Sequence, residues 1–380
     1  MRKILLLGAS GSIGRQSLDI IEQYPDKFSL VAFSVGKRSE VVPEILKKHK
    51  GVKHVYLISE KKAKELSKEF KGVKFYSGKD GLRKITSVSN YDMCVDALVG
   101  FAGMEPAIIA LERNKILCLA NKEALVAGGT LINKLLDEGK GKLYPIDSEH
   151  VALAKCLSKC RKEDVKKLII TASGGALRNV PLNKLNEQKA ADALKHPTWK
   201  MGDKITIDCA TMMNKGFEII EAFYLYHFPL SKIEVIMHDE SLVHSMVELN
   251  DGSLLVDYGK PDMHGPIAYA MFESNIYFEV KHIKSLDELK DCHFHKYDAK
   301  RYPCTELAKK CLSLGASKMI ALNASNEVAV NKYLKNKINF LDIARIVEEV
   351  VENQKILLNP SLDEIKEIDK VSRKAAEACQ

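Results

Sequence analysis

Short, continuously apolar runs alternate with stretches of helical periodicity along the first third of the chain. Such apolar runs are typical of strands buried on both faces of a parallel sheet, because these strands have no side facing solvent. They occur at Lys3–Leu7, Leu30–Val35 and Ile116–Leu119. Arg15–Gln23 follows the first run with apolar residues at helical spacing. The alternation predicts an α/β fold with an N-terminal Rossmann-like parallel sheet. Further strands of this sheet are predicted at Val55–Ser59, Tyr91–Val99 and Leu143–Ile146.

The pattern changes in the middle of the chain. Val165–Thr171 predicts another buried strand, and three later segments alternate between apolar and polar residues as strands do. Ile205–Asp208 is also predicted as a strand, whereas Asn183–Lys195 and Phe217–Tyr226 are predicted helices. From Thr305 onward the pattern is helical, so we predict a central α/β domain followed by a C-terminal helical bundle. The alternating segments are Val235–Met237, Leu242–Leu249 and Ser253–Tyr258, and the C-terminal helices are Leu307–Leu314, Ser317–Leu334, Leu341–Leu358 and Ser361–Cys379.

Length and composition narrow the class of protein. A chain of 380 residues with 46% hydrophobic residues is expected to form two or three globular domains. Its apolar runs are too short to cross a bilayer and its start has no signal-peptide cleavage site, so no membrane is expected. Nine cysteines without regular spacing indicate reduced thiols and a cytoplasmic location. The net charge of +8 comes from lysines scattered among glutamates, so no nucleic-acid partner is expected.

A glycine-rich turn, Gly8–Gly14, joins the first predicted strand to the first helix and includes Ser10, Gly11, Ser12 and Ile13. Glycines let the backbone close on a pyrophosphate, and the free N–H groups of a helix N-terminus hold the negative charge. The spacing is GxxGxxG rather than the GxGxxG of many dinucleotide-binding folds, so an ordinary strand–helix turn remains the alternative.

The end of the second predicted strand indicates which dinucleotide binds. An NAD site usually carries an acidic residue there, which accepts a hydrogen bond from the ribose 2′-hydroxyl. This chain has Gly36, Lys37 and Arg38 instead. Two cations favour the 2′-phosphate of NADP, so the sequence predicts NADPH as the cofactor.

Acidic side chains follow the last predicted strand of the N-terminal domain. On an extended chain, the carboxylates of Asp147 and Glu149 would point the same way, and their Cα atoms would lie roughly 6–7 Å apart. Oxygen ligands suit Mg²⁺ or Mn²⁺ rather than zinc. An isolated Asp-x-Glu is usually a helix cap or a surface pair, so a metal site needs a third ligand. Glu218, expected in the first turn of its helix, is the candidate.

The stretch His196–Glu218 combines a His-Pro start with the chain's single tryptophan and a lysine beside a helix start. Trp199 lies in a polar loop, which predicts a lid that excludes water, although anchoring on a neighbouring domain is the alternative. Asn214 and Lys215 are placed to hold a phosphate or substrate hydroxyls. Ser173, ahead of two glycines, is a similar candidate. Cys292–His295 is interpreted as structural, because no second pair of ligands follows at zinc spacing.

These motifs, in this order, resemble the 1-deoxy-D-xylulose 5-phosphate reductoisomerase family. The resemblance extends from Lys3 to at least Phe340. It rests on Gly8–Gly14, Ala120–Glu123, Asp147–His150, Ala172–Gly175, His196–Glu218 and Leu322–Glu327.

The resemblance implies an enzyme that rearranges and reduces 1-deoxy-D-xylulose 5-phosphate to 2-C-methyl-D-erythritol 4-phosphate, on the non-mevalonate isoprenoid route. NADPH and one Mn²⁺ or Mg²⁺ per subunit are implied as cofactors, and a homodimer as the assembly. The implied domains are an NADP-binding domain at 1–147 and a catalytic and dimerisation domain at 148–285, with a flap at about 193–203. A linker at 286–299 and a C-terminal helical domain at 300–380 follow.

The resemblance also implies the residues of the site. The metal ligands are Asp147, Glu149 and Glu218, which are counted as catalytic residues together with Lys122 and His196. The substrate-binding residues are Ser148, Glu149, Ser173, His196, Trp199, Cys209, Asn214, Lys215 and Glu218. The cofactor-binding residues are Ser10, Gly11, Ser12, Ile13, Gly36, Lys37, Arg38, Asn121, Lys122, Glu123, Met201 and Gly202.

The chain departs from the usual pattern of this family at several positions. Cys209 stands where a serine is usual, Val151 and Arg38 each replace an asparagine, and His238–Ser241 reads HDES instead of HPQS. None of these positions is an implied metal ligand, so an active enzyme is expected. Two other interpretations are a metal-independent NADP dehydrogenase of another family and a non-enzymatic NADP sensor. Chelation would leave the dehydrogenase active, and the sensor would bind NADPH without oxidising it.

Overall fold

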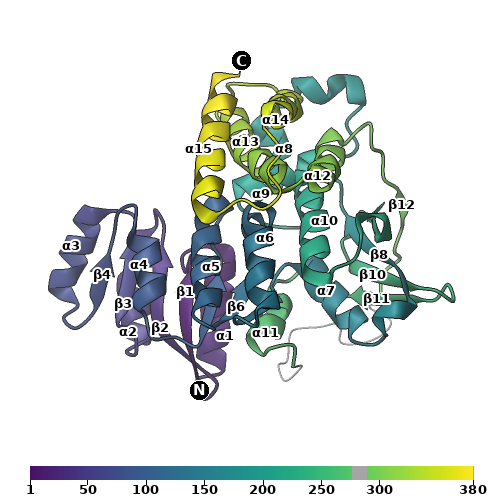
Figure 1. Ribbon diagram of the computed structural model, residues 1–380. Helices are drawn as coiled ribbons and strands as arrows, with labels where there is room; N and C mark the ends of the chain where they lie inside the picture. The colour runs from purple at the N-terminus through teal and green to yellow at the C-terminus, as the bar shows by residue number, and fades with distance from the viewer. Residues whose placement is uncertain (276–288, 380) are drawn as a thin grey trace. The chain divides into compact units, whose positions relative to one another are not determined.

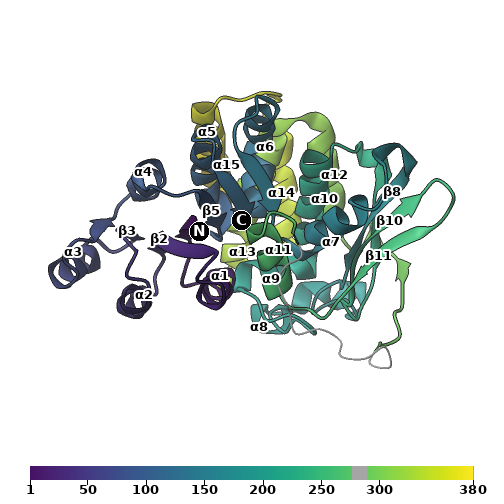
Figure 2. The ribbon, with the colours of Figure 1, turned by 90° about the horizontal axis from the view of Figure 1, so that it is seen from below.

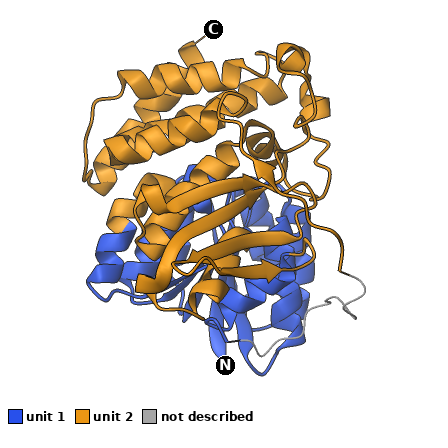
Figure 3. Ribbon diagram, turned by 90° about the vertical axis from the view of Figure 1, so that its right-hand side faces the viewer, with its two compact units in different colours: residues 1–124, 132–147, 263–280 blue, residues 125–131, 148–262, 281–380 orange. Residues whose placement is uncertain are grey.

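The computed structural model describes residues 1–275 and 289–379, which form two compact units (Figure 3). Unit 1 comprises residues 1–124, 132–147 and 263–280, and unit 2 comprises residues 125–131, 148–262 and 281–380. The units are therefore assembled from separate stretches of chain, whereas the domains expected from the sequence were continuous. The expected boundary between 285 and 286 lies outside the described residues.

Unit 1 contains a seven-stranded sheet in the order β4-β3-β2-β1-β5-β6-β7, and every neighbouring pair is parallel (Figure 1). The predicted Rossmann-like parallel sheet is confirmed. Its central strand is fully buried from Ile4 to Leu7, which explains the unbroken apolar run in the sequence. The strands are β1 (Arg2–Leu7), β2 (Phe28–Val35), β3 (His54–Leu57), β4 (Lys74–Tyr76), β5 (Met93–Asp96), β6 (Ile116–Leu119) and β7 (Lys142–Pro145).

Helices cover both faces of this sheet; α1 and α2 lie on one face and α4 and α5 on the other (Figure 2). One of the helices of unit 1 comes from much later in the chain: α11 (His264–Met271) packs against α1 and β7. The other helices are α1 (Ser12–Gln23), α2 (Val42–Lys48), α3 (Glu60–Glu69), α4 (Gly81–Val88), α5 (Met104–Glu112) and α6 (Lys122–Asp137), the last of which supplies residues to both units.

The strand order of unit 1 reverses between β1 and β5, which pair directly with each other. In open α/β sheets, ligands bind outside the carboxyl ends of the strands at such a point. Gly8 follows β1 with φ of +88°, and a Cβ there would lie 2.4 Å from the carbonyl oxygen of Ala97, which follows β5. Only glycine allows the two loops to approach this closely.

Unit 2 contains a five-stranded mixed sheet in the order β11-β10-β8-β9-β12. The β8 and β9 strands are parallel, and the remaining pairs are antiparallel. Four of the five strands fall on segments predicted from alternation or from an apolar run. The strands are β8 (Val165–Ala172), β9 (Ile233–Met237), β10 (Val243–Leu249), β11 (Leu254–Tyr258) and β12 (His295–Lys296).

The α7 and α10 helices pack against this sheet, and α12 packs on α10, so the C-terminal helices belong to the same compact unit as the sheet (Figure 1). Among the described helices, none combines the length and apolar composition that crossing a bilayer requires. The helices of unit 2 are α7 (Ser148–Leu157), α8 (Ala190–Ala193), α9 (Asp203–Thr211), α10 (Met213–Tyr226), α12 (Pro303–Leu314), α13 (Ala316–Leu334), α14 (Asp342–Asn353) and α15 (Leu362–Ala378).

Two secondary-structure predictions are wrong. Ile205–Asp208 is part of the helix α9, not a strand, because a four-residue alternation is too short to distinguish the two periods. Asn183–Lys195 is not one helix: it is divided between a 3₁₀ turn, Leu182–Glu187, and the single-turn helix α8.

Candidate active site

The predicted cofactor residues of unit 1 gather at the reversal of strand order. The turn with Ser10 and Gly11 leads into α1, where Ser12 and Ile13 occupy the first turn. Arg38, just past β2, donates from its guanidinium to the Ser10 carbonyl oxygen. The carbonyl contact thus places a cation beside the glycine turn. Gly36 and Lys37 lie in the same connection between β2 and the next helix.

Asn121 links two loops at this edge of the sheet. Its side-chain amide donates to the carbonyl oxygens of Leu98 at 2.9 Å and Gly100 at 2.8 Å. Its side-chain oxygen accepts from the Ala124 N–H at 2.7 Å, which caps the start of α6. Asn121 is almost fully buried, so it fixes the loop after β5 to the helix that carries Lys122 and Glu123.

Lys122 and Asp147 form a largely buried ion pair. The Lys122 ammonium lies 2.7 Å from an Asp147 carboxylate oxygen, and the two side chains are only 8% and 11% exposed. Both residues follow neighbouring strands of the unit 1 sheet, β6 and β7. Lys122, a catalytic residue by the family resemblance, is thus paired with one of the predicted metal ligands.

The extended-chain argument for Asp147 and Glu149 is wrong. The helix α7 begins at Ser148, so Glu149 lies in the first turn of a helix rather than on a strand. A short chain segment after a strand is often read as a continuation of it, although Ser and Asp are equally typical of helix starts. Ser148 donates from its hydroxyl to Glu149 at 2.5 Å and is nearly buried.

A lysine–carboxylate cluster joins α7 to α10 within unit 2. The Lys215 ammonium lies 3.0 Å from Glu149 and also forms an ion pair with Glu218, and oxygens of the two glutamates approach within 4.8 Å. Asn214 donates from its amide to Glu218 at 2.5 Å. Glu218 is 1% exposed. Two carboxylates that share one lysine bring several charges close together and offer oxygen atoms as possible metal ligands.

The register of α10 differs from the prediction. The helix starts at Met213, after Met212 in the left-handed conformation with φ of +59°, and not at Phe217. Asn214 and Lys215 therefore lie in its first turn and Glu218 lies in its second. Asn214 and Glu218 are then four residues apart on one helix face, which explains their contact.

Ser173 and His196 are brought together after β8. The Ser173 hydroxyl lies 3.1 Å from His196 Nε2. His196 Nδ1 accepts from the backbone N–H of Trp199 at 3.0 Å, so Nε2 carries the proton and donates to Ser173. Burial, with a smaller effect from the charge of Arg178, lowers the His196 pKa to about 4. The imidazole is consequently a neutral hydrogen-bond donor at neutral pH.

The loop that follows Ser173 closes on the helix α9. A Cβ on Gly175, which has φ of +69°, would lie 2.6 Å from the backbone of Ala210. The neighbouring Cys209 is half-buried on the same helix. Trp199 lies near the His244 ring, at 6.1 Å between centroids. Met201 and Gly202 directly precede α9. Within unit 2, Ser173, His196, Trp199 and Cys209 are therefore close neighbours in a small group of loops and helix ends.

Sequence reasoning missed a buried polar network on α9. Asp208 is 2% exposed, and it pairs with the Lys204 ammonium at 2.8 Å and accepts from the Asn326 amide at 2.9 Å. Asn326 lies on α13, in the predicted C-terminal helical region. Asp208 was missed because its segment was predicted as a strand. On a helix, the four-residue spacing from Lys204 to Asp208 predicts an ion pair between the two side chains.

The fold and these clusters define a nucleotide-dependent oxidoreductase of the α/β class. Three family models match the chain. The model of 1-deoxy-D-xylulose 5-phosphate reductoisomerase matches residues 4–129, and the model of the C-terminal domain of that enzyme matches residues 143–226. A third, described as DXP reductoisomerase C-terminal domain, matches residues 258–375. Together they cover most of the chain.

Similar proteins carry the same name. The 1-deoxy-D-xylulose 5-phosphate reductoisomerase of Exiguobacterium sp. is 41% identical over 375 residues, 98% of this chain and 97% of that protein. That of Macrococcus caseolyticus is 40% identical over 370 residues, 97% of each chain. A crystal structure of DOX-P reductoisomerase in complex with NADPH, fosmidomycin and magnesium is 34% identical, with a TM-score of 0.93, covering 100% of this chain and 98% of that one.

The enzyme from Zymomonas mobilis in complex with NADPH is 34% identical, with a TM-score of 0.90, covering 99% of this chain and 98% of that one. The chain belongs to the 1-deoxy-D-xylulose 5-phosphate reductoisomerase family. It is an oxidoreductase of that family.

Proposed function

We propose that this protein converts 1-deoxy-D-xylulose 5-phosphate to 2-C-methyl-D-erythritol 4-phosphate with NADPH and a divalent metal ion. The observation that carries the proposal is the cluster of Glu149, Lys215 and Glu218, which joins two helices of unit 2 and in which Lys215 and Glu218 are buried. The rearrangement needs a site that polarises two substrate oxygens, and the reduction needs a dinucleotide. The chain supplies a candidate site for each.

Asp147, Glu149 and Glu218 are the proposed metal ligands. All three offer carboxylate oxygens, which suit Mg²⁺ or Mn²⁺. When bound, the ion supplies Lewis-acid polarisation of the substrate's carbonyl and hydroxyl oxygens. Lys215 contacts Glu149 and Lys122 contacts Asp147, so each ammonium orients a proposed ligand carboxylate. Ser148 donates to Glu149 and has the same orienting effect.

The phosphate end of the substrate is assigned to Ser173, His196, Asn214 and Lys215. Ser173 and the His196 Nε2–H are neutral donors already in contact, and the helix N-terminus that carries Asn214 and Lys215 adds further donors. Binding energy from this remote group can support closure of the flap at about 193–203. Trp199, whose backbone N–H donates to His196, then couples phosphate binding to exclusion of water.

NADPH is assigned to the turn of unit 1 with Ser10, Gly11, Ser12 and Ile13, and to Gly36, Lys37 and Arg38 for its 2′-phosphate. Asn121, Lys122 and Glu123 flank the same edge of the sheet, and Met201 and Gly202 are assigned to the nicotinamide side. We further propose that the protein is cytoplasmic and works as a homodimer on its small-molecule substrate.

Replacing Arg38 by alanine is expected to raise the KM for NADPH by roughly tenfold and to leave the KM for NADH nearly unchanged. The guanidinium beside the glycine turn can pair with the 2′-phosphate, and a charged hydrogen bond is worth about 1.5–3 kcal/mol. Steady-state kinetics with both cofactors measure the ratio. Lys27→Ala, at an exposed cation of unit 1, is the control. Equal changes for both cofactors would contradict the assignment.

Replacing Cys209 by serine is expected to leave turnover measurable and not to raise the substrate KM. A thiol is a weaker donor than a hydroxyl, so the serine can only strengthen a phosphate contact from this position on α9. Initial rates at varied 1-deoxy-D-xylulose 5-phosphate give the answer, and Cys292→Ser serves as a matched control. A large rise in KM would show that the thiol has a different role.

The proposed function is tested by following NADPH oxidation with 1-deoxy-D-xylulose 5-phosphate, using protein stripped by a chelator, with and without added Mn²⁺. Oxidation that depends on both the sugar phosphate and Mn²⁺ is expected. Activity that survives chelation would instead favour a metal-independent dehydrogenase. Tight NADPH binding without oxidation by the sugar phosphate would favour a sensor.

A further inference from the structure

Arg178 contacts the backbone of Ser173 and has no role in the site as assigned above. Its Nη1 group lies 3.4 Å from the Ser173 carbonyl oxygen, and its Nε lies 3.4 Å from an Asp239 carboxylate oxygen. The side chain is 20% exposed, so the guanidinium is mostly removed from solvent. A cation in such surroundings is screened less than a surface lysine, and its field extends further.

The field of Arg178 reaches the residues assigned to the phosphate. Ser173 contacts His196 directly, and the Arg178 charge is one cause of the lowered pKa of that histidine, second to burial. His196 itself is neutral, so it brings a donor but no charge. Arg178 therefore provides a fixed positive charge on the Ser173 side, in addition to Lys215 on α10.

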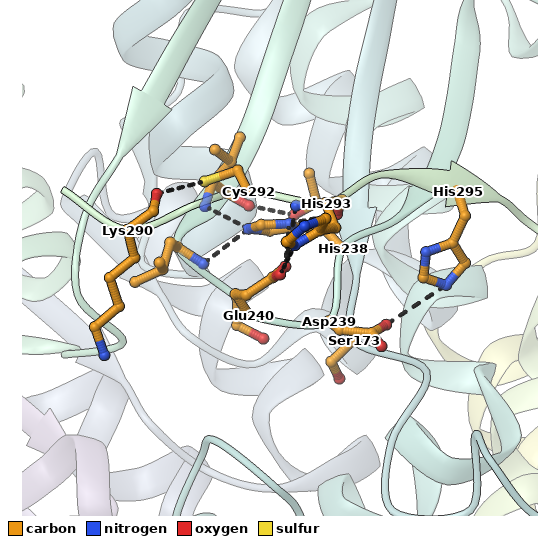
Figure 4. A network of polar contacts seen from close by, with 12 residues as sticks. Ser173, His238, Asp239, Glu240, Lys290, Cys292, His293 and His295 are labelled. Carbon is orange, nitrogen blue, oxygen red and sulfur yellow. Dashed lines mark hydrogen bonds and ion pairs between the residues drawn. The ribbon is translucent and has the colours of Figure 1, made fainter.

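Asp239 opposes this charge. It lies two residues after the end of β9 and pairs with Arg178. It also pairs with His295 Nε2 at 3.5 Å (Figure 4). It is 34% exposed. Asp239 stands in the HDES segment, where the family pattern usually has proline, so the opposing carboxylate is a feature of this chain.

We propose that Arg178 is a positioning residue for the substrate phosphate, acting through the Ser173 turn and His196, and that Asp239 weakens its effect by neutralising part of its charge. The inference rests on the proposed function, because it takes Ser173 and His196 to hold the phosphate. It adds a residue pair of opposite charge that sets the affinity for the phosphate dianion.

Substitutions of Arg178 and Asp239 are expected to change phosphate affinity in opposite directions, and this difference in sign separates an electrostatic role from a structural one. Arg178→Gln removes the cation and leaves Asp239 to repel the phosphate, whereas Asp239→Asn leaves the cation less compensated. If the pair only stabilised the fold, both substitutions would break the same contact and would weaken binding together.

The test uses the full-length protein, and its first readout needs no activity. Trp199 is the single tryptophan, and its backbone N–H donates to His196, so its fluorescence is titrated with inorganic phosphate. The second readout is KM and kcat for 1-deoxy-D-xylulose 5-phosphate. The variants are Arg178→Gln, Arg178→Lys, Asp239→Asn and the double variant Arg178→Gln with Asp239→Asn. Arg161→Gln, which removes an exposed guanidinium paired with Asp164 in the same unit, is the control.

For Arg178→Gln, the Kd for inorganic phosphate and the KM are expected to rise about tenfold, with kcat within about threefold of the parent. Asp239→Asn is expected to lower both about twofold to threefold. The double variant should bind phosphate better than Arg178→Gln, and Arg178→Lys should recover part of the loss.

An unchanged Kd and KM in Arg178→Gln, or a change of the same sign in Arg178→Gln and Asp239→Asn, overturns the proposal. If Arg178→Gln does not fold, Asp239→Asn decides alone: tighter binding supports the proposal, and equal or weaker binding overturns it. A parent protein that binds inorganic phosphate but does not oxidise NADPH with the sugar phosphate refutes the proposed function. In that case the phosphate titrations still decide on Arg178.

Discussion

Replacing Glu218 by glutamine is expected to lower kcat roughly a thousandfold while the protein stays folded. Lewis-acid stabilisation by a metal ion contributes several kcal/mol to a transition state, and each 1.4 kcal/mol is about a factor of ten in rate. Glutamine keeps the size of the side chain and an oxygen that can accept from Asn214. It removes the charge that a divalent cation needs and that pairs with Lys215.

Two measurements separate the loss of metal from a change in fold. Calorimetric titration with Mn²⁺ should show at least about a tenfold weaker affinity in Glu218→Gln. The thermal midpoint without metal should stay close to that of the parent. Glu234→Gln, on the exposed side of β9, is the matched control and should change neither. A variant with near-parent turnover and Mn²⁺ affinity would falsify the assignment of Glu218 as a ligand.

The largest expected effect on stability is that of Asp208→Ala. The substitution removes the common partner of Lys204 and Asn326, and Asn326 is fully buried. Breaking a buried, paired charge in this way costs about 3–5 kcal/mol. The network ties α9 to α13, so the loss should loosen the helix that carries Cys209 and follows the flap.

Thermal and urea unfolding of Asp208→Ala, monitored by circular dichroism, should show lower unfolding midpoints than the parent protein. A chain with two compact units does not have to unfold in one step, so the midpoints of both transitions are compared. Asp203→Ala is the control: this exposed residue lies in the first turn of the same helix, where a carboxylate contributes about 0.3–1 kcal/mol. Similar midpoints in the two variants would contradict a structural role for Asp208.

The sequence predicted the part of the fold that depends on strong periodicity. Lys3–Leu7 was predicted correctly as a strand, because its apolar run is short for a helix and the glycines that follow it mark its end. The long C-terminal helices were equally clear. Ile205–Asp208 was assigned wrongly, since Ile-Thr-Ile alternates on a strand and also places Thr206 and Ile207 on the buried side of a helix.

The chemistry of the site was predictable as residue types and not as contacts. Asp147, Glu149, Lys215 and Glu218 were all named from the sequence, yet the pairing of Lys122 with Asp147 and of Lys215 with both glutamates comes from the fold. The pairs Lys122–Asp147 and Lys215–Glu149 join residues that are far apart in the chain, so local pattern contains no information about them. Lys215 and Glu218 are three residues apart on α10, and their pairing becomes predictable only when the start of that helix is known. Arg178 was missed for the same reason: its partner Asp239 comes much later in the chain, after α10.

The recruitment of α11 to unit 1 has a consequence for synthesis. This helix covers α1 and β7 but is translated after almost all of the unit 2 sheet, so the N-terminal unit cannot complete its core while it leaves the ribosome. Buried residues of α11, including Ile267 and Met271, belong to the same apolar cluster as Ile4 and Leu6. A fragment cut at residue 147 would expose that apolar surface to solvent and would be prone to aggregate.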